Sequence, residues 1–130
     1  MATVTFRDET ATGKAVAAWE VEGVPDLMTV RELIRLRVRE EVARYNARPG
    51  HRFNGLVRPD DAETDLNGYR LRTPRPLDWQ RQAEVAERAF LANGFFVLTG
   101  DRQVDSLDEV VDLGTDSDLV FIKLVALVGG

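Results

Sequence analysis

Few side chains in this sequence have the chemistry of a catalytic or metal-binding site. His51 is the only histidine, and it lies in a predicted loop with no cysteine and no carboxylate cluster near it. The acidic run Asp60, Asp61, Glu63 and Asp65 resembles a Ca²⁺ loop in composition, but it lacks the Asp-x-Asp-x-Asp-Gly spacing and the closing Glu. We therefore expect His51 to be a solvated loop residue rather than a catalytic base, and the acidic run to be a solvated loop.

The composition argues against several classes of protein. The chain has no cysteine, so it offers no thiolate nucleophile, disulfide framework or cysteine-based metal site. No Gly-rich phosphate loop, Ser/His/Asp set or metal-ligand spacing occurs in it. The net charge is -5 and the arginines alternate with acidic residues, which is not the pattern of a nucleic-acid-binding face. The sequence thus predicts a protein that is not an enzyme, needs no cofactor or metal, and binds no nucleic acid.

The sequence contains no pattern typical of membrane insertion or export. Residues 1–9 alternate apolar and polar side chains and lack the basic start and apolar run of a signal peptide. The longest apolar stretch, residues 119–128, contains Lys123 and is too short to span a bilayer. We therefore expect a cytoplasmic protein without a membrane partner.

The first third of the chain predicts a hairpin followed by a helix. Residues 3–8 and 16–24 alternate apolar and polar side chains and are joined by a turn over 10–14. Thr29 and Glu32 have the spacing of a capping box, which marks the start of a helix. The apolar positions of that helix recur at helical spacing: Val30, Leu33, Ile34, Val38, Val42 and Tyr45. Its outer side carries Arg31, Arg35, Arg39 and Arg44, which we interpret as a solvated helix face.

The middle and the end of the chain have different patterns. Residues 47–76 are rich in Pro and Gly, with short strand-like patterns at 55–57 and 69–71, and we expect a small hairpin or an ordered insertion there. A second helix is predicted from Asp78 to an Asn93-Gly94 C-cap. Strands are then predicted at 95–99, 103–104 and 119–128, with a helical turn at 106–113 that Ser106 would cap, and Gly129-Gly130 follow.

This order of elements, without the insertion, resembles the ubiquitin β-grasp. The segment FFVLTGDRQVDSLDEVVDLGTDSDLVFIKLVALVGG resembles the C-terminal half of ubiquitin throughout. The likeness covers about residues 3–45 and 95–130 and gives the segment at about 47–93 no counterpart. It looks like the bacterial ubiquitin-like proteins encoded with ubiquitin-type activating enzymes, and less closely like the small sulfur carriers. The resemblance implies a single α+β domain over 1–130, a mixed sheet packed on one main helix, an insertion at about 47–93 and a tail at 125–130.

The resemblance also implies where the chemistry lies. Gly130 would supply a terminal carboxylate that an ATP-dependent activating enzyme adenylates, carries as a thioester and transfers to a target amine. Gly129 has no side chain, so it would let the tail pass through a narrow channel. One alternative is a sulfur carrier with a thiocarboxylate at Gly130, although those proteins are shorter and lack a helical insertion. A non-covalent, self-assembling β-grasp module is the other, because a fold does not determine a function.

The final predicted strand is apolar on both faces, so both faces must be covered. We expect Val120, Ile122 and Leu124 to face the core helix. Phe121 and Val125 would then lie on the face that binds partners in ubiquitin, and Leu127 and Val128 would lead into the diglycine. The expected cover is the insertion with its helix around Trp79 and Phe90. A partner enzyme or a second copy of the chain is the alternative.

The resemblance predicts protein partners and one acceptor site. The partners are an activating enzyme, a conjugating enzyme, a deconjugating protease, a target protein and a second copy of this chain. Basic residues include only two lysines, Lys14 and Lys123. Lys123 lies within the final predicted strand, so Lys14, in the hairpin turn, is the candidate acceptor.

Overall fold

The computed structural model describes residues 1–65 and 68–123, and its described part is α+β with two helices and a five-stranded mixed sheet. The chain divides into two compact units, which we describe separately. Unit 1 comprises Met1–Glu32 and Phe90–Gly130, and unit 2 comprises Leu33–Ala89. Neither described helix is long and apolar enough to cross a membrane.

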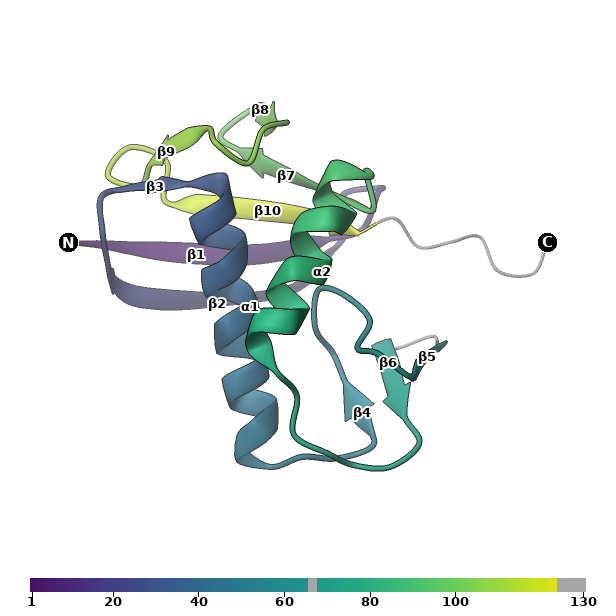
Figure 1. The fold of residues 1–130 in the computed structure, drawn as a ribbon. Helices are drawn as coiled ribbons and strands as arrows, with labels where there is room; N and C mark the ends of the chain where they lie inside the picture. Colours follow the sequence, from purple (N-terminus) through teal and green to yellow (C-terminus); the bar gives the residue numbers. More distant parts are fainter. Residues whose placement is uncertain (66–67, 124–130) are drawn as a thin grey trace. The chain divides into compact units, whose positions relative to one another are not determined.

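The five-stranded sheet of unit 1 joins the two ends of the chain. Its strand order is β2-β1-β10-β7-β8, with β10 parallel to β1 and the other neighbouring pairs antiparallel (Figure 1). The five strands are β1 (Ala2–Glu9), β2 (Ala15–Val24), β7 (Phe95–Thr99), β8 (Arg102–Val104) and β10 (Asp118–Lys123). The predicted N-terminal hairpin and the predicted strand at 95–99 are therefore confirmed.

The buried face of this sheet is aromatic. Phe6 lies opposite Trp19 across the hairpin, and their ring centroids are 5.6 Å apart. The Phe121 ring lies 6.0 Å from Phe6 and 5.9 Å from Phe95, and the Phe90 ring lies 6.0 Å from Phe95. The Phe6–Phe121 contact is edge-to-face, a preferred aromatic geometry, and the other three ring pairs are tilted. They link the hairpin to the C-terminal strands.

The start of the first helix confirms the predicted capping box. Helix α1 runs from Val30 to Ala47. The Thr29 N–H donates to Glu32 Oε1 at 3.0 Å, and the Glu32 N–H donates to Thr29 Oγ1 at 3.1 Å. Two backbone donors at the helix end, which have no intrahelical partners, are satisfied in this way. The first of these bonds is the main reason that the pKa of Glu32 lies below its ordinary value.

A short ribbon in unit 1 corrects one prediction. We expected a helical turn at residues 106–113, but β9 (Val110–Asp112) pairs there with β3 (Leu27–Thr29). Ser106 does start a turn, because its Oγ accepts the Asp108 N–H at 3.2 Å. The turn ends there because the Glu109 and Leu107 carbonyls accept the N–H groups of Val30 and Arg31, which starts the pairing with the other segment.

Unit 2 contains most of α1, a small sheet and most of the second helix. The sheet has the order β4-β6-β5, with β4 (Arg52–Phe53), β5 (Ala62–Asp65) and β6 (Gly68–Leu71). Helix α2 runs from Trp79 to Leu91; Asp78 accepts the Gln80 N–H, and Asn93 has a left-handed φ of 60°. The predicted hairpin and second helix are confirmed. The strand-like reading of residues 55–57 is wrong, because the Leu56 N–H donates to the Glu41 carboxylate instead of to a strand.

The arginines on the outer side of α1 take part in contacts rather than forming a merely solvated face. In unit 1, Arg31 forms an ion pair with Asp108 at 2.6 Å. In unit 2, the Arg35 and Arg39 guanidinium carbons lie 5.4 and 5.8 Å from the centre of the Trp79 ring. Such cation–π contacts contribute about 0.5–1 kcal/mol at exposed sites. The prediction missed them because they join residues far apart in the sequence.

Candidate functional site

The side chains of β10 alternate between buried and half-buried, and this alternation corrects the predicted partner-binding face. Leu119 and Phe121 are fully buried, whereas Val120 and Ile122 are half-buried. Phe121 therefore belongs to the core and not to the partner-binding face. The prediction was wrong by one residue, because a one-residue change of register moves every side chain of a strand to the other face.

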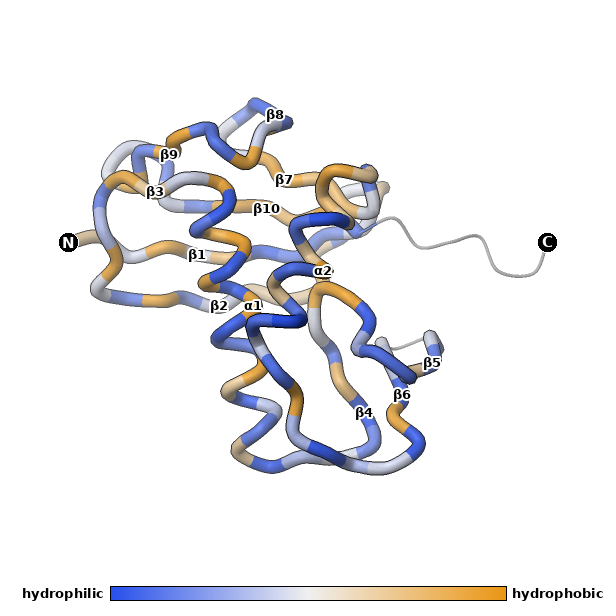
Figure 2. The backbone as a smooth tube through the Cα atoms, in the orientation of Figure 1, coloured by the Kyte–Doolittle hydropathy of each residue, from blue (hydrophilic) through white to orange (hydrophobic). Residues whose placement is uncertain are grey.

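Four half-buried apolar side chains lie together on the face opposite the core. Val120 pairs directly with Leu98, and Ile122 pairs with Phe96. Directly opposite residues of antiparallel strands have Cβ atoms about 4.5–5.5 Å apart on the same face. The four residues Phe96, Leu98, Val120 and Ile122 therefore form one continuous apolar surface, which we call the outer strip. Figure 2 shows β7 and β10 as neighbouring apolar segments.

The outer strip has a polar rim. Arg7 and Glu9 of β1 lie beside Val120 and Ile122, and Gln103 of β8 lies opposite Leu98. The Arg7 guanidinium is held in place by a 2.9 Å contact with the Asp118 carboxylate. An apolar centre with a polar rim is typical of a protein–protein interface. The strip is therefore the candidate partner-binding surface of unit 1.

The predicted reactive end follows this surface along the chain. Lys123 is the last described residue of β10, and Val125, Leu127, Val128, Gly129 and Gly130 lie outside the described residues. Gly130 is the eighth residue after Ile122 in the sequence.

The candidate acceptor Lys14 is exposed at the turn between β1 and β2. Its N–H donates to Thr10 Oγ1 at 3.0 Å, and its carbonyl accepts the Thr10 N–H at 2.9 Å. These bonds fix the backbone and leave the side chain in solvent. Lys123, in contrast, is half-buried at the end of β10. This difference in exposure favours Lys14 over Lys123 as the acceptor, and the role of Lys14 stays a prediction.

Unit 2 contains a buried ion pair that the sequence analysis missed. Arg37 is 1% exposed, and its Nε lies 3.4 Å from Oε1 of Glu41, one helical turn later. The same oxygen accepts the Leu56 N–H at 3.3 Å. Burial, and to a smaller extent the charge of Glu41, raises the pKa of Tyr69. The sequence did contain a sign that these two residues are buried, because positions 37 and 41 fall on the same side of the helix as its apolar residues.

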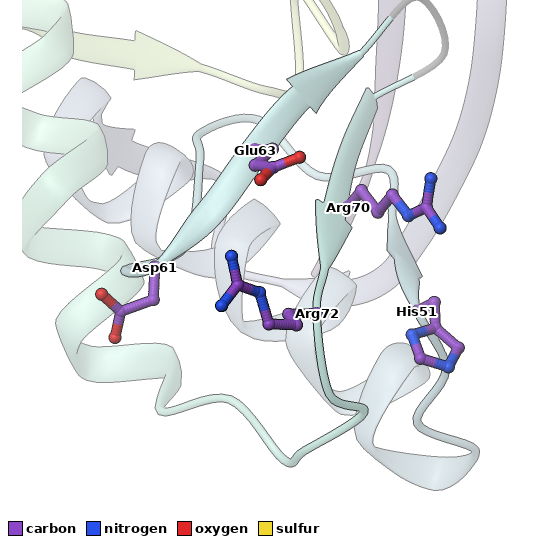
Figure 3. Close-up of a pocket in the computed structure, with 5 residues that line it drawn as sticks. All are labelled: His51, Asp61, Glu63, Arg70 and Arg72. Carbon is purple, nitrogen blue, oxygen red and sulfur yellow. The ribbon is translucent and has the colours of Figure 1, made fainter.

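A polar hollow of about 540 Å³ lies beside the small sheet of unit 2. It is lined by His51, Asp61, Glu63, Arg70 and Arg72, and Figure 3 shows Arg72 directed toward the two carboxylates while Arg70 extends to the other side of β6. All five side chains are exposed, as predicted for His51. The group combines two guanidinium groups with two carboxylates and contains no thiol or hydroxyl nucleophile.

The remainder of the acidic run forms ion pairs within unit 2. Asp60 accepts a hydrogen bond from Arg81 at 3.1 Å, and this bond, followed by the Arg81 charge, holds the pKa of Asp60 below its ordinary value. Asp65 lies 3.1 Å from Arg52. The run is therefore divided between β5 and the segment before it, and its side chains point to different partners. No group of three or more His, Cys, Asp or Glu residues suited to a metal ion occurs in the described parts of the chain.

Comparison with known proteins assigns no role to these residues. No protein-family model, curated protein or solved structure matches the chain.

Proposed function

We propose that this chain is a ubiquitin-like protein modifier built on a β-grasp. The observation that carries the proposal is the strand order of unit 1, in which the final strand β10 runs parallel to β1 between the N-terminal hairpin and β7. The resemblance requires this joining, because it assigns residues 3–45 and 95–130 to one domain.

The proposed chemistry takes place at Gly130. An activating enzyme uses ATP to form an acyl adenylate at the Gly130 carboxylate and releases pyrophosphate. A thiol of the enzyme then displaces AMP to form a thioester, and a target amine displaces the thiol to form an amide. This chain is the substrate of those steps, so it needs no catalytic residue of its own. Gly129 supports the role because it adds no side chain near the reacting carboxylate.

The outer strip is the proposed docking surface for the activating enzyme. Its apolar side chains and polar rim match the anatomy of an interface, and β10 continues in sequence toward Gly130. Tight docking at the strip would hold the chain while the terminus reaches a separate active site. Val120 and Ile122, in place of Phe121, are the proposed contact residues. The proposed tail still includes Val125, Leu127 and Val128.

The two alternatives differ in what becomes of Gly130. A sulfur carrier would use the same adenylate but would end as a thiocarboxylate. A non-covalent module would use the strip without activation. The first experiment is therefore intact mass spectrometry of the protein from its host, which determines whether Gly130 carries a free carboxylate.

Incubation in a host lysate with ATP then tests activation. We expect a higher-mass adduct that forms with ATP, disappears on addition of a thiol reductant and is missing for a variant without Gly130. Sulfur in place of a terminal oxygen would favour the carrier. An identical pattern for the two proteins would contradict activation at Gly130.

A further inference from the structure

The polar hollow of unit 2 borders the exposed face of its small sheet. Glu63 of β5 lies directly opposite Arg70 of β6, and directly opposite residues of antiparallel strands project from the same face. The neighbouring pair, Ala62 and Leu71, is buried on the other face, because successive side chains of a strand alternate. Glu63 and Arg70 therefore belong to the solvent-facing side, where the hollow has a volume of about 540 Å³.

The charged side chains around the hollow are not neutralised by one another. The first and last members of the acidic run, Asp60 and Asp65, each form an ion pair with an arginine. In contrast, four side chains that line the hollow form no ion pair or hydrogen bond within the described parts of the chain: Asp61, Glu63, Arg70 and Arg72. Two charges of each sign are therefore open to a ligand.

These charges are separated across β6. Figure 3 shows Asp61 and Glu63 on one side of this strand, with Arg72 directed toward them. Arg70 and His51 lie on the other side. The His51 Nδ1 donates to a backbone carbonyl oxygen of β6 at 3.0 Å, because a carbonyl can only accept. One side thus holds two carboxylates and one guanidinium, and the other holds a guanidinium and an imidazole.

This arrangement suits a ligand that carries both charges. A ligand with only a carboxylate would be attracted by Arg70 but repelled by Asp61 and Glu63, and a ligand with only an ammonium group would meet the opposite problem. A zwitterion places each of its charges beside groups of the other sign. All the residues that line the hollow are polar, so charge-assisted hydrogen bonds would supply the affinity.

The strand order sets the distance between the two charges of the ligand. Strands β5 and β4 lie on either side of β6. Neighbouring strands are about 4.7–4.9 Å apart, so β5 and β4 are separated by roughly 9–10 Å. An extended chain spans at most about 3.3–3.6 Å per residue, so three residues reach about 10–11 Å. A free amino acid is therefore too short, and a peptide of two or three residues with free ends matches the width of the sheet.

We propose that the hollow binds a short peptide of two or three residues, with its amino group at Asp61 and Glu63 and its carboxylate at Arg70. The site uses no part of the outer strip and no residue of the tail. Its test is therefore independent of the proposed modifier function. The proposal gives the insertion, which has no counterpart in ubiquitin, a binding role of its own.

NMR titration of the full chain with triglycine tests the need for both charges. Triglycine has free ends and no side chains, so only its terminal charges and its backbone can be recognised. We expect saturable shifts of the resonances around the hollow, and at least about tenfold weaker binding of N-acetyl-triglycine, triglycine amide and free glycine. Equal affinity for triglycine and its N-acetylated amide, or no saturation by triglycine at about 20 mM, would overturn the proposal.

Single substitutions assign each end of the peptide. Asp61→Asn removes one charge and keeps a residue type that tolerates the left-handed φ of 63° at this position. We expect Asp61→Asn and Arg70→Gln each to weaken triglycine binding about tenfold. N-acetylation of the peptide should then cost Asp61→Asn less affinity than it costs the original protein, and amidation of the peptide carboxylate should cost Arg70→Gln less.

The matched controls are Glu84→Gln and Arg88→Gln, at exposed positions of α2 that do not line the hollow. Both should bind triglycine as the original protein does. Urea denaturation of every variant establishes that the fold is retained. The assigned contacts are wrong if the controls weaken binding as much as Asp61→Asn and Arg70→Gln. They are also wrong if acetylation and amidation cost these two variants as much as they cost the original protein.

Discussion

At the residue scale, the buried pair Arg37 and Glu41 joins two parts of unit 2. Glu41 Oε1 contacts the guanidinium of Arg37 and accepts the N–H of Leu56, so α1 and the segment after β4 share one carboxylate. Both side chains of the pair are nearly excluded from solvent. A buried charge that loses its partner is costly, whereas a matched pair can often be replaced by apolar groups.

Removal of Glu41 should therefore destabilise the protein strongly. We expect Glu41→Ala to lower the free energy of unfolding by about 3 kcal/mol, because it leaves Arg37 buried without this carboxylate. Addition of Arg37→Met should recover much of the loss. Urea denaturation measures both effects, and Glu40→Ala, at the neighbouring half-buried position, is the matched control. A loss no larger than that of the control would show that the pair contributes little.

The capping box gives a smaller effect with a defined pH dependence. Thr29→Ala should cost about 1 kcal/mol of stability, because the Glu32 N–H loses its acceptor. The pKa of Glu32 is lowered in the folded protein, mainly by the Thr29 N–H. The stability that the ionised Glu32 contributes is therefore complete above its ordinary pKa of 4.5. It is lost as the pH falls through the lower pKa of the folded protein.

The pH dependence can be measured on Glu32→Gln. The stability difference between the original protein and this variant should shrink as the pH falls below 4.5. Asp101→Asn, at an exposed position of unit 1, provides the control for a carboxylate outside the cap. A difference that stays constant with pH would contradict a role for the ionised Glu32.

At the scale of elements, the orientation of a strand with one apolar face could be predicted from the sequence. The orientation of β10, which is apolar on both faces, could not. The strand predicted at residues 3–8 alternates clearly, and its apolar residues Val4 and Phe6 are buried. Strand β10 is apolar at every position from Leu119 to Ile122, so alternation could not say which residues face the core. Pairing with β1 and β7 decides this, and pairing between distant segments is not encoded in local periodicity. The outer strip could therefore not be located from the sequence.

The outer strip predicts a separation between folding and function. Leu98→Lys places a charge in the centre of the strip, and it should reduce formation of the activated adduct by at least about tenfold while circular dichroism is unchanged. Thr3→Lys adds the same charge at an exposed position of β1 outside the strip and should have little effect. Equal activation of the two variants would exclude the strip as the docking surface.

At the scale of the whole molecule, the α+β class followed from the order of periodic segments. The hairpin, the two helices and the strands at 95–99 and 103–104 were each predicted from their own residues, whereas β9 was predicted as a helical turn. The small sheet of unit 2 was expected as a hairpin, but its third strand β4 contains two residues and has too short a pattern to detect. The single-domain organisation and the role of the tail stay predictions, because they depend on contacts and residues beyond local patterns.

The central claim is that Gly130 becomes joined to an amine of another protein. The direct measurement is mass spectrometry of an N-terminally tagged copy, purified under denaturing conditions from its native host, beside a copy that lacks Gly130. We predict peptides in which a target amine carries the Leu-Val-Gly-Gly end, present with the full chain and missing with the shortened one. Tagged protein that is unmodified, and that behaves identically without Gly130, would contradict the proposed function.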